Sequence, residues 1–489
     1  MTADYIAFHA TSRPDAVALV DRGRAINFAT FDRDLRNLIP AVSALGVPKG
    51  GSVAVGCDDL YTHWLLLLAF EELGIAAVSF YSFEGEGASF TLGGVDLVLT
   101  EPHFVALAGF RQHAITREWL SQSLSRDAGL PDDRHSARSP EDPVRILRTS
   151  GTTGSPKRLV HPRSLHEAWV ARWIVMAGID RRSRLLLTMP FTVNGMYACA
   201  TACLRAGGTV FNEVMPAARD IARAIVAHAI TTLILAPFQI EQLLNALPDG
   251  FVKPASFTLC SFGAAVSGTL RGRALQMIAT EHIDMYGSNE AGFIASTWAA
   301  GNDEGSTIWP GARVEIVDDG DRPLPDGEAG RIRVRTPDMV QGYLGNAEAT
   351  RQMFRDGWFY PGDLGIRRGA RGLLILGRGD SLLNFGGRKH PAEVLERAIL
   401  KAVTLRDVAV CSAPNADGIE EILIGMVGAP NEDRALLERL RDALKPFRAG
   451  NFRAARLPEI PRNPNGKIQR DVLRRAILDA LSSSPVVTS

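Results

Sequence analysis

The chain has 489 residues, of which 46% are hydrophobic and 22% are charged, so it has the composition of a globular protein and is too long for one ordinary domain. Its 54 lysines and arginines balance its 54 aspartates and glutamates, which excludes nucleic-acid or membrane binding driven by net charge. Five cysteines without a CxxC pair indicate neither a disulfide framework nor a zinc site, and they favour a cytoplasmic location.

The N-terminal segment lacks a basic stretch followed by an apolar core, so no signal peptide is predicted. The longest apolar stretch, Trp64–Phe80, is interrupted by Glu71 and Glu72. A membrane-spanning helix needs about 20 predominantly apolar residues. The stretch is therefore predicted to be a buried helix that runs into a strand, and no membrane span is expected.

Apolar runs bounded by turn residues alternate with amphipathic helical patterns through most of the chain. The runs predicted to be buried strands are 52–57, 95–100, 144–149, 184–190 and 231–237, and the predicted helices include 218–229 and 239–247. This alternation predicts an α/β fold with largely parallel sheets. The SLHE sequence at 164–167 predicts a capping box that opens a further helix.

The pattern of apolar runs and turn residues changes after about Gly301. Short apolar runs broken by Asp-Gly and proline turns predict a small β subdomain. A second change near residue 380 precedes a predicted helix at 391–402, two strands and later helices. We therefore expect a large domain at 1–379 and a small α+β domain at 380–489.

Residues 148–158 read RTSGTTGSPKR and follow a predicted strand. Gly151 and Gly154 permit backbone N–H groups to point at an anion, and Lys157 adds a positive charge. Because Pro156 precedes the lysine and no serine or threonine follows it, the loop is not a Walker A loop. Taken alone, it is either a phosphate-holding loop or an ordinary surface turn.

Five stretches in this order resemble the motifs of one family, the AMP-forming acyl- and aryl-CoA synthetases with their relatives, the adenylation domains and luciferases. They are TSGTTGSPK (149–157), MYGSNEAG (285–292), GWFYPGDLG (357–365), GRGDSLLNFGGRKHPAEVLE (377–396) and PRNPNGKIQR (461–470). The resemblance spans nearly the whole chain. It implies a two-step reaction in which a carboxylate attacks the α-phosphate of ATP and a thiol then displaces AMP from the acyl-adenylate.

The resemblance also implies roles for individual residues. Lys467 would stabilise the adenylation transition state, Lys157 would hold the leaving phosphates, and Glu290 would bind Mg²⁺. Together these three are the expected catalytic residues, with Glu290 also the metal ligand. The implied nucleotide-binding residues are Thr149, Ser150, Gly151, Thr152, Thr153, Gly154, Gly263, Ala264, Ala265, Tyr286, Gly287, Ser288, Asn289, Asp363 and Arg378.

Within this set, Tyr286 would stack beside adenine, and Asp363 would accept hydrogen bonds from both ribose hydroxyls, with Arg378 nearby. As an isolated residue, Tyr286 could be a core aromatic. Asp363 and Arg378 could each be a turn-capping or surface charge. The small C-terminal domain of the family rotates between the half-reactions. The remaining implied residues are the hinge Asp380, the thiol-tunnel residues Gly386 and Gly387, and the acid-pocket residues Thr192, Asn194 and Gly195.

The chain departs from the common family pattern at three positions. Asn289 stands where threonine is usual, and Arg158 follows the loop lysine where glycine is usual. Thr192 replaces the histidine or aromatic residue that many members carry near the acyl pocket, which bears on the acid bound. His161 and His166 flank the loop without a second ligand at metal spacing, and they are predicted to be structural.

The first functional hypothesis is an acid–thiol ligase that uses ATP, Mg²⁺, CoA and an aromatic or medium-chain fatty acid. The second is a free-standing enzyme that loads an acyl group onto an acyl carrier protein, and both hypotheses share all five motifs. A third is a catalytically inactive nucleotide-binding regulator, against which the retention of Glu290, Asp363, Arg378 and Lys467 speaks. No nucleic-acid partner is expected, and the chain is expected to be a monomer or a homodimer.

Overall fold

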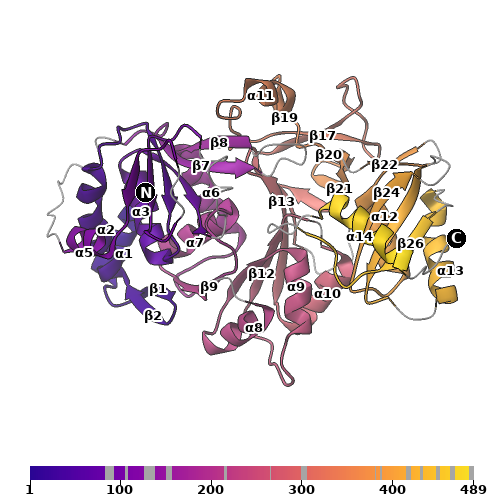
Figure 1. Cartoon of the computed structure of the whole chain (residues 1–489), viewed down its shortest axis with the longest axis horizontal. Helices are drawn as coiled ribbons and strands as arrows, with labels where there is room; N and C mark the ends of the chain where they lie inside the picture. The colour runs from indigo at the N-terminus through magenta and orange to yellow at the C-terminus, as the bar shows by residue number, and fades with distance from the viewer. Residues whose placement is uncertain are drawn as a thin grey trace.

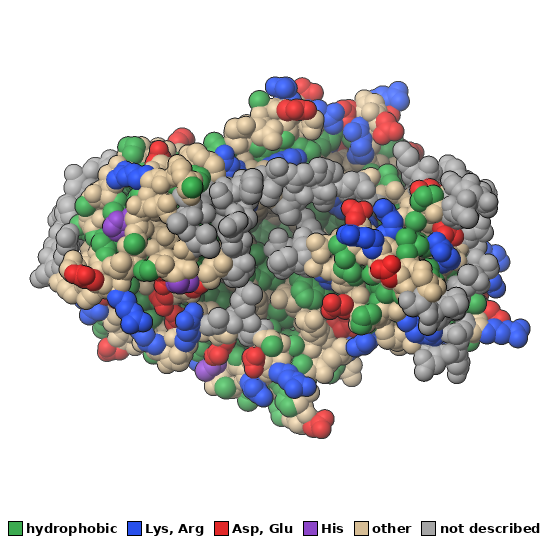
Figure 2. Space-filling model, viewed as in Figure 1, with side chains coloured by type: hydrophobic (Ala, Val, Ile, Leu, Met, Phe, Trp, Pro, Cys, Tyr) green, Lys and Arg blue, Asp and Glu red, His purple; other side chains and the backbone are tan. Residues whose placement is uncertain are grey.

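The computed structural model describes the chain except for residues 83–92, 105–107, 126–137, 150–156, 214–216, 265, 299–304, 380–381, 386–387, 415–419, 430–432, 448–451, 463–467 and 484–489. The molecule is elongated, with the N-terminal part at one end and the C-terminal part, in yellow, at the other (Figure 1). Lys/Arg and Asp/Glu side chains are interspersed over the face in Figure 2. No helix in the described ranges is both long and apolar enough to cross a bilayer.

The first sheet is built by the N-terminal third of the chain. Its strands, in pairing order, are β6 (Gln112–Ala114), β5 (Leu97–Thr100), β3 (Ser52–Gly56), β4 (Ala76–Phe80), β7 (Pro143–Thr149) and β8 (Lys157–Pro162). Neighbours pair in parallel except β7 and β8, which form an antiparallel hairpin. Helices around this sheet are α1 (Thr2–Ser12), α2 (Phe28–Ser43), α3 (Leu60–Glu72), α5 (Arg117–Leu124), α6 (Arg163–Met176) and α7 (Asn194–Ala206). As predicted, α3 is a buried helix that leads into β4.

The second sheet is built from the middle of the chain and the small β subdomain, and two N-terminal strands complete its other end. Its strands, in pairing order, are β18 (Phe354–Arg355), β19 (Trp358–Phe359), β17 (Ala329–Arg335), β20 (Asp363–Arg368), β21 (Gly372–Arg378), β15 (Ser306–Ile308), β14 (Gly292–Thr297), β13 (Glu281–Ser288), β12 (Thr258–Phe262), β11 (Thr232–Leu235), β9 (Arg184–Leu187), β10 (Thr209–Asn212), β1 (Val17–Asp21) and β2 (Arg24–Asn27), and β16 (Arg313–Val317) pairs with β17. Pairing is parallel from β13 to β1 and antiparallel from β13 through β14 onward. The predicted α/β architecture and the β subdomain after Gly301 are confirmed.

Four helices accompany the second sheet. They are α8 (Ala218–Ala227), α9 (Pro237–Asn245), α10 (Gly268–Met277) and α11 (Ala347–Met353). Apolar residues of α8, α9 and α10 form one buried cluster with those of β9, β11 and β12. The parallel half of the sheet is thus covered by helices, which leaves the carboxyl ends of its strands as the edge where ligands bind in open α/β sheets.

The C-terminal part is a three-stranded sheet between helices. Its elements are the hairpin of β22 (Leu382–Phe385) and β23 (Arg388–Pro391), the strands β24 (Asp407–Pro414), β25 (Glu420–Val427) and β26 (Phe452–Arg456), the helices α12 (Ala392–Ala402), α13 (Asp433–Leu444) and α14 (Arg470–Ser483), and the short 3₁₀ helix η3 (Lys445–Phe447). One face of the sheet packs on α12 and α13 and the other on α14. This is the predicted α+β arrangement, although β26 was not expected from its sequence, FRAAR. The division of the chain at residue 380 stays a prediction.

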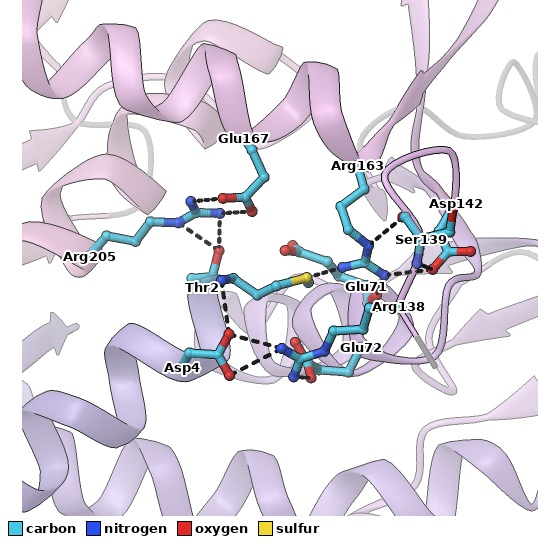
Figure 3. Close-up of polar contacts among 11 residues, drawn as sticks. Thr2, Asp4, Glu71, Glu72, Arg138, Ser139, Asp142, Arg163, Glu167 and Arg205 are labelled. Carbon is cyan, nitrogen blue, oxygen red and sulfur yellow. Dashed lines mark hydrogen bonds and ion pairs between the residues drawn. The ribbon is translucent and has the colours of Figure 1, made fainter. Parts of the chain in front are cut away.

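The predicted capping box at 164–167 is wrong. Pro162 is the N-cap of α6, and no side chain caps the helix. Glu167 instead makes two hydrogen bonds of 2.6 Å with the guanidinium of Arg205 on α7 (Figure 3). Arg205 is only 5% exposed, and a buried charge needs a counter-charge more than a helix end needs one extra hydrogen bond. The tertiary ion pair therefore overrides the local signal.

Glu71, near the end of α3, is a buried carboxylate beside this polar network (Figure 3). Its side-chain oxygens have no hydrogen-bond partner within the described part of the chain, and Nε2 of His166 lies 3.9 Å from Oε2. Burial raises the pKa of Glu71 from 4.5 to about 7, although the nearby Arg205 lowers it. The folded protein therefore favours the protonated side chain near neutral pH.

Replacing Glu71 with glutamine is expected to remove a pH-dependent loss of stability. Because the pKa is higher in the folded than in the unfolded state, the folded protein binds more protons between about pH 4.5 and 7, and stability falls as the pH rises through this window. Between pH 5 and 8, the wild type should lose about 2–3 kcal/mol more of its free energy of unfolding than Glu71→Gln. Urea denaturation at both pH values measures this difference, and equal losses would contradict the assignment.

Candidate active site

The hairpin of β7 and β8 carries the predicted phosphate loop at its tip. Thr149, the last residue of β7, pairs with Lys157, the first residue of β8, so these two residues flank the loop. The predicted loop residues that lie outside the described ranges are Ser150, Gly151, Thr152, Thr153 and Gly154. The structure thus supports the strand–loop–strand arrangement, and the contacts of the loop itself stay a prediction.

Lys157 and Glu290 both contact one tyrosine, Tyr343. The Nζ atom of Lys157 is 5.0 Å from the ring centroid of Tyr343, and the Tyr343 hydroxyl donates a 2.9 Å hydrogen bond to Oε1 of Glu290. Both Glu290 and Tyr343 are buried. Two residues predicted to serve the phosphates, which are 133 positions apart in the sequence, therefore converge on one site.

Tyr343 was not predicted from the sequence. It follows a glycine in a turn between β17 and α11, and no periodicity marks it as a site residue. Burial first, and then the Glu290 carboxylate, raise the pKa of Tyr343 above its usual value. The hydroxyl therefore stays protonated and remains a hydrogen-bond donor that orients Glu290.

The predicted adenine site lies at the carboxyl edge of the parallel strands. Because β12 pairs with β13 up to its last residue, Gly263 and Ala264 directly after β12 lie beside Tyr286 on β13. Gly263 has a φ of +93°, a left-handed backbone that glycine adopts without steric cost. Ala265, which was predicted to bind the nucleotide together with Gly263 and Ala264, lies outside the described residues.

The turn after Tyr286 is shaped by close backbone contacts. A Cβ on Gly287 would lie 2.4 Å from the carbonyl oxygen of Gly292, so only glycine fits there. The Ser288 hydroxyl accepts a 3.2 Å hydrogen bond from the backbone N–H of Ala291, the last residue of the turn. The backbone carbonyl of Asn289 is 3.0 Å from Nε2 of His161. Burial lowers the pKa of His161 to about 4, so its neutral ring holds this turn as a structural histidine, as predicted.

Tyr286, Asp363 and Arg378 form a contiguous polar cluster. The Tyr286 hydroxyl donates a 2.5 Å hydrogen bond to Oδ2 of Asp363, and Nη1 of Arg378 lies 3.4 Å from Oδ1 of Asp363. Asp363 and Arg378 are direct partners in the β20–β21 pairing, which sets their spacing. Burial, followed by the Asp363 carboxylate, raises the pKa of Tyr286. The tyrosine therefore remains a neutral hydrogen-bond donor to Asp363.

The predicted acid-pocket residues lie where β9 connects to α7. A Cβ on Gly195 would be 3.5 Å from the ring of Phe262 and 3.8 Å from that of Trp173, so this glycine lies beside two aromatic rings that the sequence did not identify. Asn194 begins α7, is 2% exposed, and has no described hydrogen-bond partner for its amide. Thr192 lies in the preceding turn. Phe262 ends β12, so the acid-pocket residues adjoin the predicted adenine wall.

The site residues predicted in the C-terminal part are the catalytic lysine, the hinge residue and the two thiol-tunnel glycines. Lys467, Asp380, Gly386 and Gly387 lie outside the described residues. Next to the predicted hinge, Arg397 of α12 donates hydrogen bonds of 3.0 and 2.9 Å to two carbonyl groups of β21. These bonds join the C-terminal part to the strand that ends at Arg378.

Residues 6–344 match the sequence model of the family described as AMP-binding enzyme. The chain is 25% identical over 497 residues to the 4-chlorobenzoate–CoA ligase of Arthrobacter sp, covering 96% of this chain and 94% of that protein. It is 27% identical over 502 residues to the fatty acid–[acyl-carrier-protein] ligase ScoC of Streptomyces coeruleorubidus, covering 96% and 95%. Its fold is similar to that of ATP-bound MatB from Rhodopseudomonas palustris, with a TM-score of 0.84, 21% identity and coverage of 97% and 99%.

Proposed function

Because the chain belongs to the AMP-binding enzyme family, we propose that it is an ATP-dependent acid–thiol ligase that works in two half-reactions. In the first, a carboxylate oxygen bonds to the α-phosphorus of ATP and the bond to the β-phosphate oxygen breaks, which gives an acyl-adenylate and pyrophosphate. In the second, a thiol sulfur bonds to the acyl carbon, AMP leaves, and the thiol proton is released. A carboxylate is a weak nucleophile, so rate enhancement depends on positioning and on stabilisation of charge at the phosphates.

The observation that carries this proposal is that Tyr286 and Glu290, which lie on and just after β13, each belong to a polar cluster with distant residues. The pair of Lys157 and Glu290 around Tyr343 would serve the phosphates, and the cluster of Tyr286 and Asp363 would serve the nucleoside. Gly195 lies against Phe262 at the end of the same sheet, so an acid held there would approach the nucleotide. This arrangement supports neighbouring sites for the acid, the nucleoside and the phosphates.

A magnesium ion fits the donor set at Glu290. Its carboxylate is a hard oxygen ligand, and the hydrogen bond from Tyr343 leaves Oε2 for a cation. When bound, Mg²⁺ would neutralise phosphate charge. The residues of the chain then orient ATP, exclude water and place the acid, with Lys467 proposed to stabilise the charge that develops at the α-phosphate.

The acid is proposed to be aromatic, and the thiol to be CoA. The partly exposed aromatic ring of Phe262 next to Gly195 offers a flat wall for an aryl group. The similarity to 4-chlorobenzoate–CoA ligase supports the same class of acid and the same thiol. A carrier-protein thiol is the second candidate, which the similarity to the fatty acid–[acyl-carrier-protein] ligase ScoC favours.

A pyrophosphate-release screen over aryl, fatty and amino acids, with and without CoA, tests the proposal. The expected result is release that depends on an aryl acid, with thioester and AMP formed only when CoA is added. If pyrophosphate is released but a thioester forms only after a carrier protein is supplied, the thiol substrate is the carrier protein and not CoA. Absence of acid-dependent release with every acid would overturn the ligase function.

Replacing Asp363 with alanine is expected to raise the KM for ATP by about 10–100-fold, because a hydrogen bond to a charged group contributes about 1.5–3 kcal/mol. The KM for the acid should change far less. Steady-state pyrophosphate release with each substrate varied in turn measures both constants. Asp326→Asn, at an aspartate of the same β subdomain that pairs at 3.3 Å with Arg367, is the matched control and should leave both constants unchanged.

A further inference from the structure

The turn at 190–193, between β9 and α7, is held at its centre by side chains of the other sheet. The Val193 N–H donates a 3.0 Å hydrogen bond to the Pro190 carbonyl and closes the turn. The Phe191 N–H donates at 3.1 Å to the hydroxyl of Tyr81, and the Phe191 carbonyl accepts a 2.9 Å hydrogen bond from Nη2 of Arg145. Both backbone groups of one turn residue are therefore fixed by side chains that follow or lie on β4 and β7.

Arg145 is an unusual group to find in this interior. It is 2% exposed, and no carboxylate of the described residues lies within ion-pair distance of it. The buried Arg163 and Arg205, by contrast, pair with the carboxylates of Asp142 and Glu167. A buried charge without a carboxylate partner is costly, so Arg145 contributes its directed hydrogen bonds rather than an ion pair.

The guanidinium is oriented on three sides. Its Nη1 donates a 3.2 Å hydrogen bond to the hydroxyl of Ser79, and its central carbon lies 4.2 Å from the ring centroid of Tyr197. His63 is in turn 3.0 Å from the same Ser79 hydroxyl and 2.8 Å from a backbone carbonyl after β3. Stacking on an aromatic face and a planar set of donors are properties of arginine that lysine lacks.

Arg145 stands between two parts of the proposed active site. It lies on β7, four residues before Thr149 at the base of the predicted phosphate loop. Its acceptor, Phe191, directly precedes Thr192 and is three residues before Asn194 at the start of the predicted acid pocket. The ring of Phe191 is fully buried, with its centroid 5.3 Å from that of Trp64, so the turn cannot shift independently of the first sheet.

We propose that Arg145 is a positioning residue that fixes the acid-binding turn at 190–193 relative to the phosphate-loop strand. It does not touch the reacting atoms. It sets the distance between the acid carboxylate, held beyond Phe191, and the α-phosphate, held beyond Thr149. The inference rests on the proposed ligase function, and its physical basis is that a misplacement of about 1 Å can cost on the order of 10²-fold in rate.

Arg145→Met tests the proposal, because methionine has a similar length and no hydrogen-bond donor. Acid-dependent ATP–pyrophosphate exchange should fall by about 10²-fold in kcat/KM, with the acid KM raised at least about 10-fold and the ATP KM changed by less than about 3-fold. Arg145→Lys keeps the charge and one donor, and it should recover only part of the loss. Tyr81→Phe removes the acceptor of the Phe191 N–H, and it should change the acid KM in the same direction by about 3–10-fold.

Arg184→Met is the matched control. Arg184 also stacks on an aromatic ring, with its central carbon 4.6 Å from the Phe211 centroid, and donates a 2.5 Å hydrogen bond to the His228 carbonyl. It lies at the start of β9, away from the proposed site. Its removal should lower the Tm and leave the acid KM unchanged.

Three outcomes decide the inference. A folded Arg145→Met enzyme with an unchanged acid KM, or with acid and ATP KM raised equally, overturns the positioning role while the ligase function stands. If Arg145→Met does not fold, Arg145→Lys and Tyr81→Phe decide, and unchanged acid KM in both overturns it. A wild-type protein that catalyses no exchange with any acid overturns the ligase function and this inference together.

Discussion

Replacing Lys467 with alanine is expected to slow acyl-adenylate formation by about 10²–10³-fold, the usual loss when one preorganised donor to a developing charge is removed. Thioester formation from preformed acyl-adenylate should be largely spared, because no phosphate–oxygen bond to pyrophosphate is broken in that step. ATP–pyrophosphate exchange measures the first half-reaction. Single-turnover mixing of synthetic acyl-adenylate with CoA measures the second.

The control for this experiment is Lys445→Ala, at an exposed lysine of η3 in the same C-terminal part. It should leave both half-reactions unchanged. If Lys467→Ala slowed both half-reactions equally, the lysine would not be specific to adenylation. Lys467 lies outside the described residues, so this experiment also tests an assignment that rests on the sequence motif.

Replacing Glu290 with glutamine is expected to lower the adenylation rate by about 10²-fold and to raise the Mg²⁺ concentration needed for half-maximal activity. Glutamine keeps the shape of the side chain and can still accept the hydrogen bond from Tyr343, which is 2.9 Å long in the wild type. The variant therefore removes the negative charge and little else. A Mg²⁺ titration of ATP–pyrophosphate exchange measures both effects.

Two further variants show whether the effect of Glu290→Gln comes from the lost charge at this position. Tyr343→Phe leaves the Glu290 charge in place and removes the donor that orients it, so a smaller loss of about 10-fold is expected. Glu315→Gln, at a carboxylate that pairs with Arg333 on the neighbouring strand, should not change the Mg²⁺ requirement. A Glu290→Gln enzyme with the wild-type Mg²⁺ dependence would show that this carboxylate is not the metal ligand.

Much of the fold could be predicted because its signals are local. The buried strands β3, β9 and β11 are short apolar runs between turn residues, and α8 has an apolar stripe at helical spacing. The Asp-Gly and proline turns after Gly301 predicted the β subdomain. In contrast, β26 has the sequence FRAAR, and it is a strand because β25 offers an unpaired edge beside it.

Local signals failed where a distant charge competed with them. The SLHE sequence has the pattern of a capping box, yet Glu167 pairs with Arg205, which comes 38 positions later in the chain. The gain from pairing a buried guanidinium exceeds the gain from one cap hydrogen bond. The sequence close to residue 164 does not include Arg205, so it cannot indicate this ion pair.

The candidate site divides in the same way. The motifs, through their resemblance to one family and their order along the chain, predicted Lys157, Glu290, Tyr286, Asp363 and Arg378 as site residues. Cations, hard oxygen ligands and acceptor-only carboxylates suit the phosphate chemistry that the resemblance implies.

The tertiary structure alone decided how these residues meet and what supports them. Tyr343 joins Lys157 to Glu290, Phe262 and Trp173 lie beside Gly195, and Arg145 spans from β7 to the turn at 190–193. Each of these contacts joins residues that are at least 22 positions apart in the sequence. Their side chains are ordinary core or surface types until the strands pair and the helices pack, because a hydrogen bond or a stacked ring depends on distance in space and not on separation along the chain.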